Sequence, residues 1–239
     1  MILEICIDRI ESAFAALAGG ANRLEVCCAL AVGGLTPSAG LLAECCDFAG
    51  ITVMAMIRPR AGDFCYAPKE VDVMVRDIVA ARDAGVDGVV IGALTSAGKV
   101  DRHVCQQLLD AAGTLDVTFH RAFDLAVDPF EALDDIINLG IKRLLTSGQQ
   151  VTALDGIDLI RRLVLRSGDS LAIMAGAGVD ASNVEQLLEV GLREIHGSCS
   201  VSERRSGSAS AVAFGETLRV TCANNVRDIR SAMARNADS

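Results

Sequence analysis

The sequence contains no tryptophan, and aromatic residues make up only 3% of its 239 residues. Hydrophobic residues nevertheless account for 51% of the chain. Its core must therefore be built from Ala, Val, Ile and Leu, which is typical of parallel sheets that are covered on both faces. The length is also close to the roughly 250 residues of an α/β barrel.

The sequence also lacks basic runs, because no stretch of Lys or Arg exceeds two residues and the net charge is −9. This composition argues against a surface that follows nucleic-acid phosphates. The N-terminus enters a strand pattern at once and lacks the basic start of a signal peptide. No apolar stretch approaches the ~18 residues of a membrane span without a charge or a glycine. We therefore expect a cytoplasmic protein with no nucleic-acid or membrane partner.

No Cys-x-x-Cys motif occurs among the nine cysteines. Their odd number and the length of the chain argue against both a disulfide scaffold and a zinc ribbon, so we expect most of the thiols to be reduced. Cys45, Cys46 and Cys105 lie in helical patterns and are interpreted as small hydrophobic residues.

Short β-type runs alternate eight times with longer amphipathic runs of helical spacing. The predicted strands are Leu3–Cys6, Arg23–Cys27, Thr52–Arg58, Gly88–Gly92, Asp116–His120, Arg143–Ser147, Leu171–Ala175 and Arg193–Ser198. Eight even units favour an α/β fold of one domain over residues 1–239, a (β/α)₈ TIM barrel with a closed eight-stranded parallel sheet. A doubly wound open sheet is the alternative.

Start and stop signals of helices support the repeat. Thr36-Pro37 and Asp128-Pro129 each place an N-cap residue before a proline at the first helical position. A glycine that can adopt the left-handed conformation follows each of seven helical runs. These glycines are Gly19, Gly50, Gly85, Gly113, Gly140, Gly168 and Gly191.

Two segments interrupt the alternation of predicted strands and helices. Residues 199–225 are rich in Ser, Gly and Ala and precede a last helix at about 226–236. Such a long excursion is expected to be a lid or partly disordered. The stretch Arg58–Pro68 is a second long loop, on the face where a barrel keeps its site.

Several positions that should point into the barrel are polar. The alternation of side chains along each strand places the following residues inside: Glu4, Cys6, Glu25, Cys27, Met56, Arg58, Thr118, His120, Thr146, Glu194, His196 and Ser198. Buried carboxylates need partners, and we expect Arg58, His120 or His196 to supply them. A lone residue of this kind is often structural, but their convergence at one rim predicts a site. Its candidate catalytic residues are Glu4, Glu25, Arg58, His120, Thr146 and His196.

The seventh strand runs into Met-Ala-Gly-Ala-Gly-Val-Asp-Ala at 174–181. Gly176, Gly178 and Ala181 fit G-x-G-x-x-A, but the motif lies far from a first βαβ unit. With Ser198 after the eighth strand, Gly176 and Gly178 better fit a phosphate or anion site of a barrel. A tight turn that needs two glycines is the plainer alternative.

Several cysteines lie near the same rim. Cys6, Cys27 and Met56 stand on adjacent strands and could supply the soft ligands that select Cu(I). Burial in the core is the alternative for these cysteines.

These residues also carry a family resemblance. The chain is similar, in order from residue 2 to about 200, to the CutC family of copper-homeostasis proteins. The matching stretches are Leu-Glu-Ile-Cys at 3–6, Gly-Gly-Ala-Asn-Arg-Leu-Glu-Val-Cys at 19–27, Gly-Gly-Leu-Thr-Pro-Ser at 33–38, Ile-Arg-Pro-Arg-Ala-Gly-Asp-Phe at 57–64, Val-Thr-Phe-His-Arg-Ala-Phe-Asp at 117–124, Leu-Thr-Ser-Gly-Gln at 145–149 and Met-Ala-Gly-Ala-Gly-Val at 174–179.

The resemblance implies a cytosolic TIM barrel, a homo-oligomer (dimer or tetramer), that takes part in copper homeostasis. It also implies Cu(I) binding, with Cys6 and Cys27 as the matching metal ligands. The residues themselves leave a second interpretation open, an enzyme that acts on a small phosphorylated or carboxylated metabolite. In that enzyme Arg58 and the turn at 176–178 would hold the anion, and His120 would act as general acid or base.

Overall fold

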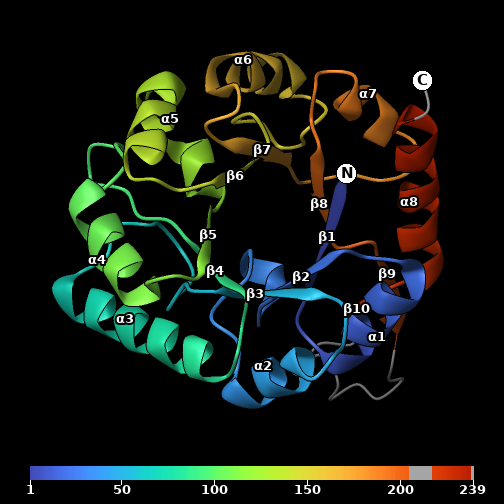
Figure 1. The fold of residues 1–239 in the computed structure, drawn as a ribbon, viewed down its shortest axis with the longest axis horizontal. Coiled ribbons are helices and arrows are strands. Elements are labelled where there is room, and N and C mark those ends of the chain that lie inside the picture. Colours follow the sequence, from blue (N-terminus) through green and yellow to red (C-terminus); the bar gives the residue numbers. More distant parts are fainter. Residues whose placement is uncertain (205–216, 238–239) are drawn as a thin grey trace.

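The computed structural model describes residues 1–204 and 217–237. Eight parallel strands form a closed barrel in the order of the chain, and helices surround it (Figure 1). The strands are β1 (Ile2–Ile7), β2 (Arg23–Val26), β3 (Thr52–Met56), β4 (Gly88–Ile91), β5 (Asp116–Phe119), β6 (Arg143–Thr146), β7 (Ala172–Ala175) and β8 (Glu194–Gly197). The predicted fold class is therefore confirmed. Most predicted strands extend one or two residues too far, because those last residues already turn into the loops.

The outer helices are α1 (Ile10–Gly19), α2 (Ala39–Cys46), α3 (Pro68–Asp83), α4 (Arg102–Ala112), α5 (Pro129–Asn138), α6 (Ile157–Ser167), α7 (Val184–Leu188) and α8 (Ala223–Ala237). Two 3₁₀ turns, η1 (Leu30–Val32) and η2 (Arg121–Leu125), follow β2 and β5. Among the residues that the structure describes, no helix has the length and apolar character that crossing a bilayer requires.

The main hydrophobic core lies between the sheet and the helices. Outward strand residues such as Leu3, Ile5 and Phe119 are fully buried there. A small second apolar cluster lies inside the barrel and consists of Cys27, Met54, Met56 and Val90 from β2, β3 and β4. The rest of the barrel interior is lined largely by polar residues.

Predicted helix boundaries are partly confirmed. The Asp128 carboxylate caps α5 by accepting hydrogen bonds from the backbone amides of Phe130 and Glu131. The predicted cap at Thr36 is wrong, because Ser38 caps α2. The Thr36 hydroxyl instead accepts a 3.0 Å hydrogen bond from the backbone amide of Arg58, beyond the end of β3.

The predicted excursion before the last helix contains a two-stranded antiparallel hairpin, β9 (Ser200–Arg204) and β10 (Thr217–Thr221). Its central part, 205–216, lies outside the described residues, so the expectation of a lid or of partial disorder there stays a prediction. The last helix begins at Ala223, three residues earlier than predicted.

Six of the seven predicted helix-ending glycines have positive φ. Gly19 is the exception, because the left-handed residue that ends α1 is Gly20. Gly19 belongs to α1 and lies against α8, where a Cβ atom would be 2.4 Å from the Cβ of Val226. The absence of a side chain at Gly19 therefore allows α8 to pack closely on α1.

Gly19→Ala should lower the free energy of unfolding by about 1–3 kcal/mol, because the added methyl overpacks this contact. Gly40→Ala is the matched control, since a Cβ atom there meets nothing within 4 Å. That change should stabilise α2 by about 0.5–1 kcal/mol. Urea unfolding followed by circular dichroism measures both. Equal effects of the two changes would contradict the packing role of Gly19.

Candidate functional site

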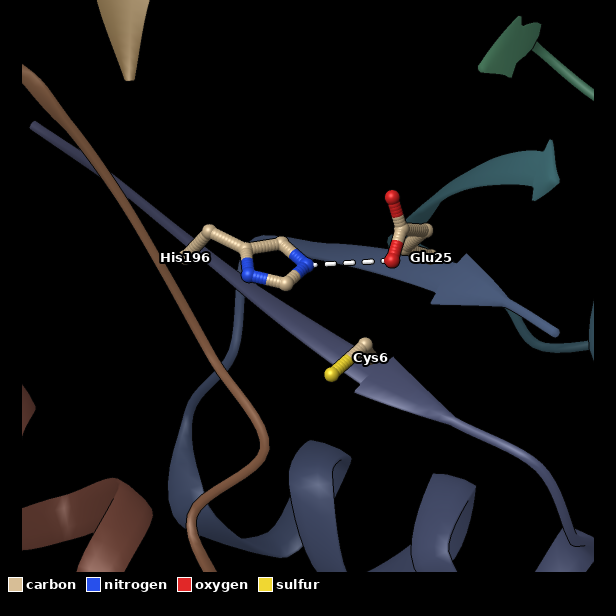
Figure 2. A group of neighbouring side chains, drawn as sticks. All are labelled: Cys6, Glu25 and His196. Atoms are coloured by element: carbon tan, nitrogen blue, oxygen red, sulfur yellow. Dashed lines mark hydrogen bonds and ion pairs between the residues drawn. The ribbon is translucent and has the colours of Figure 1, made fainter. Parts of the chain in front are cut away.

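Three side chains from adjacent strands meet near the carboxyl end of the barrel. Cys6 on β1 lies in register with Glu25 on β2, and His196 comes from β8 on the other side of β1. Figure 2 shows the thiol, the carboxylate and the imidazole turned toward one another. Their ligand atoms all lie within 4.8 Å of one another. A thiol, an imidazole and a carboxylate at this spacing can hold a metal ion.

The Glu25 carboxylate and the His196 ring form a buried pair, with 3.0 Å between Oε2 and Nε2. Burial alone would raise the pKa of Glu25, but His196 holds it below its usual value. Burial alone would lower the pKa of His196, but Glu25 and Cys6 raise it well above its usual value. Each partner therefore favours the charged form of the other.

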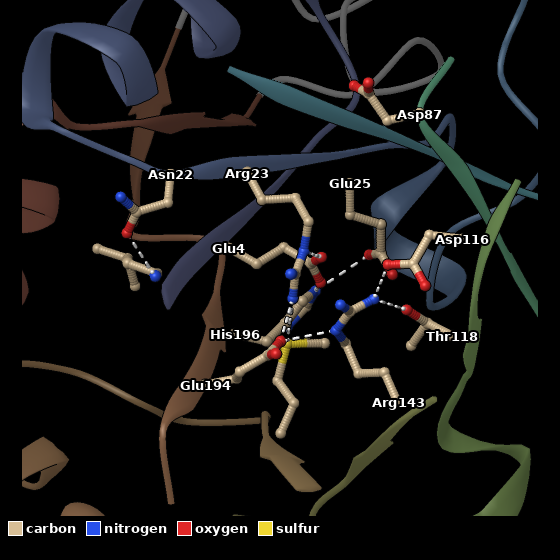
Figure 3. Close-up of polar contacts among 12 residues, drawn as sticks. Glu4, Asn22, Arg23, Glu25, Asp87, Asp116, Thr118, Arg143, Glu194 and His196 are labelled. Carbon is tan, nitrogen blue, oxygen red and sulfur yellow. Dashed lines mark hydrogen bonds and ion pairs between the residues drawn. The ribbon is translucent and has the colours of Figure 1, made fainter. Parts of the chain in front are cut away.

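A network of charges lies beneath this pair, toward the amino ends of the strands (Figure 3). Arg23 bonds to both Glu4 and Glu194. Arg143 also bonds to Glu194, with 2.7 Å between Nε and Oε2. Its Nη1 donates to Asp116 Oδ2 at 2.8 Å and to Thr118 Oγ1 at 3.1 Å.

The predicted need for partners of the buried carboxylates is therefore met largely by other residues. Arg23 and Arg143 neutralise Glu4 and Glu194, whereas the predicted partner His196 pairs closely with Glu25 and lies at the longer distance of 3.9 Å from Glu4. Arg23 has the same strand parity as Glu25, so the alternation could have identified it.

His120, just after β5, is 3% exposed. Its Nδ1 accepts a 3.1 Å hydrogen bond from the backbone amide of Ala122, so the proton of the neutral ring is on Nε2. Burial, followed by the nearby charge of Arg58, lowers the pKa of His120 to about 4. The ring is thus a neutral hydrogen-bond donor at physiological pH. Among the described residues, Nε2 has no hydrogen-bond partner.

Arg58, just beyond β3, is 6% exposed and is held by backbone carbonyls. Its Nη1 donates to Val32 O at 2.8 Å and to Gly34 O at 3.1 Å, and its Nη2 donates to Gly62 O at 3.0 Å. The guanidinium stacks on the ring of Phe64, 4.8 Å from its centroid. Arg58 therefore does not pair with a buried carboxylate as the sequence suggested.

Cys6, Glu25, His196, His120 and Arg58 border one cavity of about 1060 Å³, whereas the lower charge network does not line it. Its walls include residues of the strand ends, of the β9–β10 hairpin and of α8. Predicted site residues among them are Cys6, Glu25, Met56, Arg58, His120, Gly178, His196 and Ser198.

The remaining predicted residues lie elsewhere. The inward orientation predicted for Thr146 is wrong, since Leu145 lines the cavity and the Thr146 hydroxyl donates to Asp124 Oδ1 at 2.5 Å. Leu144 and Leu145 in β6 are both apolar, so the sequence gave no alternation from which to assign the inward side of this strand. Asp124 was missed, although it also accepts hydrogen bonds from the amides of Ser147 and Gln149 and so organises the end of β6.

Glu4 lies deeper in the barrel, whereas Cys27 follows the carboxyl end of β2 and is covered by the loop at Gly34. Glu4 is fully buried, with Oε1 3.9 Å from His196 Nε2. Cys27 is also fully buried, and its Sγ lies 3.6 Å from Glu25 Oε2. Burial and the carboxylate of Glu25 raise the pKa of Cys27 well above its usual value.

The glycine-rich turn after β7 has a packing role at its first glycine. A Cβ atom on Gly176 would lie 2.7 Å from Leu145 and 3.0 Å from His196 Nδ1, so the glycine makes room for that ring. Gly178 lines the cavity and has a φ of 68°. The helix after this turn, α7, has five residues. The anion site predicted at Gly176, Gly178 and Ser198 stays a prediction.

Comparison with known proteins identifies relatives over most of the chain. The model of the CutC family matches residues 1–201. A CutC family protein of Photobacterium profundum is 52% identical over 195 residues, which cover 81% of this chain and 80% of that protein. A human protein named copper homeostasis protein cutC homolog is 42% identical over 247 residues, covering 98% of this chain and 89% of the human one.

A solved structure of a CutC protein, from Streptococcus agalactiae, superposes with a TM-score of 0.79. It is 33% identical in sequence, and the match covers 83% of this chain and 98% of that one. The barrel described above is therefore shared with that protein.

The neutral state of His120 predicts a pH dependence of stability. Its pKa is about 4 in the folded chain, against an ordinary value of 6.5. Between these values the unfolded chain binds a proton that the folded chain does not, so stability falls as pH falls from 6.5 to 4. The contribution is at most about 1.4 kcal/mol per pH unit.

Urea unfolding of the wild type and of His120→Gln at several pH values in this window isolates the contribution. The wild type should lose more stability on acidification than the variant, because the variant has no imidazole at this position. Parallel pH curves for the two proteins would show that His120 takes up its proton normally.

Proposed function

The chain belongs to the CutC family, and we propose that it takes part in copper homeostasis by binding Cu(I) at Cys6 and His196. The human relative is named for copper homeostasis. The observation that carries the proposal is the group of Cys6, Glu25 and His196, whose ligand atoms lie within 4.8 Å of one another beside a cavity. This arrangement gives an ion a route to a thiol and an imidazole.

The donor set fits copper. A thiolate is a soft ligand that selects Cu(I), and imidazole suits copper as well. The role of Glu25 follows from its bond to His196 Nε2. A metal-ligating histidine commonly donates its second N–H to a carboxylate, which fixes the orientation of the ring and raises its basicity. Glu25 would orient His196 in this way and supply compensating charge.

Cys27 takes a lesser part in this proposal. Its thiol does not line the cavity, and its raised pKa disfavours the thiolate that would bind the ion. Met56 does line the cavity, and its thioether is a further soft group near the site.

Cys6→Ser should weaken Cu(I) binding by more than the roughly 10- to 100-fold that the loss of a supporting residue costs a metal site. Glu25→Gln should cost about 10- to 100-fold, since it removes only the support of His196. Cys27→Ser should have a smaller effect than Cys6→Ser. Anaerobic titration of the reduced protein against a competing chelator measures each affinity.

Cys105→Ser is the matched control, because Cys105 is a fully buried thiol on α4, behind the sheet. It should leave the affinity unchanged. Equal losses in Cys6→Ser and Cys105→Ser, or an unchanged affinity in Cys6→Ser, would contradict the proposed ligands.

A second candidate function is favoured by the size of the cavity. Its volume of about 1060 Å³ is that of a small-molecule site and far exceeds the needs of one ion. The cavity contains a neutral imidazole, a cation and a carboxylate, the groups that acid–base catalysis uses. The second candidate is therefore an enzyme that acts on a small phosphorylated or carboxylated metabolite, with His120 as general acid or base.

This second candidate predicts turnover that depends on His120. A panel of small carboxylated and phosphorylated compounds can be incubated with the protein and followed by NMR. Any turnover should fall about 10²- to 10⁴-fold in His120→Ala, the usual contribution of a general acid or base. Cys105→Ser should keep the full rate. An unchanged rate in His120→Ala would exclude this residue from the reaction.

A further inference from the structure

Three of the residues that line the cavity each have a buried polar atom without a hydrogen-bond partner in the described part of the chain. These atoms are Glu25 Oε1, Arg58 Nε and His120 Nε2, three of the five such side-chain atoms among the described residues. Leaving buried polar atoms unpaired is costly, and native proteins rarely keep them without a reason. Their gathering at one cavity indicates that a ligand supplies the missing partners.

One of these atoms, Arg58 Nε, belongs to a buried cation that has no counter-ion among the described residues. In the part of the chain that the structure describes, the Arg58 guanidinium donates its hydrogen bonds to backbone carbonyls. Within the described residues, no carboxylate lies within ion-pair distance of it. A buried charge of this kind is normally paired. The Nε–H of Arg58, which has no partner among the described residues, is therefore suited to an anion.

The other two atoms define what else the ligand must carry. His120 Nε2–H can only donate, because Nδ1 already accepts from the backbone. Glu25 Oε1 can only accept while the carboxylate is ionised, and its Oε2 is engaged with His196. The site thus offers two hydrogen-bond donors and one acceptor. A ligand that satisfies all three must accept two hydrogen bonds and donate one.

The ring of Phe64 holds the two donors in place. Its centroid lies 4.8 Å from the Arg58 guanidinium carbon and 4.9 Å from the centroid of His120. Gly92 leaves space for the imidazole, since a Cβ atom there would lie 2.5 Å from it. The donors are thus fixed before a ligand arrives, which lowers the entropic cost of binding.

We propose that this part of the cavity binds a small organic anion that carries a hydroxyl group. The anionic group accepts hydrogen bonds from Arg58 Nε and His120 Nε2, and the hydroxyl donates to Glu25 Oε1. Carboxylates and phosphate monoesters share this chemistry. The site requires no copper, so it goes beyond the copper proposal, and it supplies a substrate class for the second candidate function without requiring turnover.

Isothermal titration of metal-free, reduced protein tests the proposal with four probes. Glycerate and glycerol 3-phosphate carry both features, propionate lacks the hydroxyl, and glycerol lacks the anion. At least one of the first two should bind about tenfold or more tightly than propionate and glycerol, the difference expected for one hydrogen bond to a charged group. Tighter glycerate assigns a carboxylate site, and tighter glycerol 3-phosphate assigns a phosphate site.

Arg58→Ala and His120→Ala should each weaken the tighter probe by about tenfold or more, for the same reason. Arg219→Ala is the matched control, because Arg219 also lines the cavity but is exposed and belongs to β10. It should leave the affinity unchanged. If Arg58→Ala does not fold by circular dichroism, His120→Ala carries the test.

Failure of both glycerate and glycerol 3-phosphate to bind the wild type would overturn the proposal. So would equal affinity in the wild type and His120→Ala, or an equal loss in Arg219→Ala. The titration contains no copper and measures no turnover. Its failure is therefore distinguishable from a failure of copper binding at Cys6 or of the proposed enzyme.

Discussion

The need to neutralise charge inside a closed sheet governs the interior of this barrel. An ionised carboxylate removed from water is stable only when it is paired and hydrogen-bonded. Arg23 and Arg143 meet this need between Glu4, Glu194 and Asp116. Buried ion pairs of this kind add little net stability, but removing one partner leaves an uncompensated charge. The network therefore fixes the positions of the groups above it.

This charge network affects the groups that lie nearer the carboxyl ends of the strands. With Glu4 engaged chiefly by Arg23, the closer partner of His196 is Glu25, at 3.0 Å against 3.9 Å for Glu4, and each of the two favours the charged form of the other. Glu25 directs only one oxygen at His196 and keeps the other unpaired. The lower network thus accounts for a carboxylate that is fixed on one side and available on the other. This arrangement of the Glu25 carboxylate does not require a glycine-rich loop or a helix terminus.

The sequence predicted the barrel because eight helix–strand units and their glycine stops follow local rules that tertiary contacts did not override. Alternation along the strands also predicted that Cys6, Glu25 and His196 share an interior. It failed at β6, where Leu144 and Leu145 are both apolar and the parity is ambiguous. It could not predict which partners meet across the barrel, because that depends on the stagger between strands. Arg58 illustrates the same limit, since its loop turns it toward backbone carbonyls.

The cavity consequently has two chemically different sides. The proposed copper ligands Cys6 and His196 come from β1 and β8, whereas the hydrogen-bond donors Arg58 and His120 follow β3 and β5. Glu25 stands on β2 and interacts electrostatically with both histidines. Under the two proposals above, one oxygen of Glu25 would orient a copper ligand while the other accepted a hydrogen bond from an organic anion. Any energetic coupling between the two occupants would then act through this one carboxylate, and by linkage it would be equal in both directions.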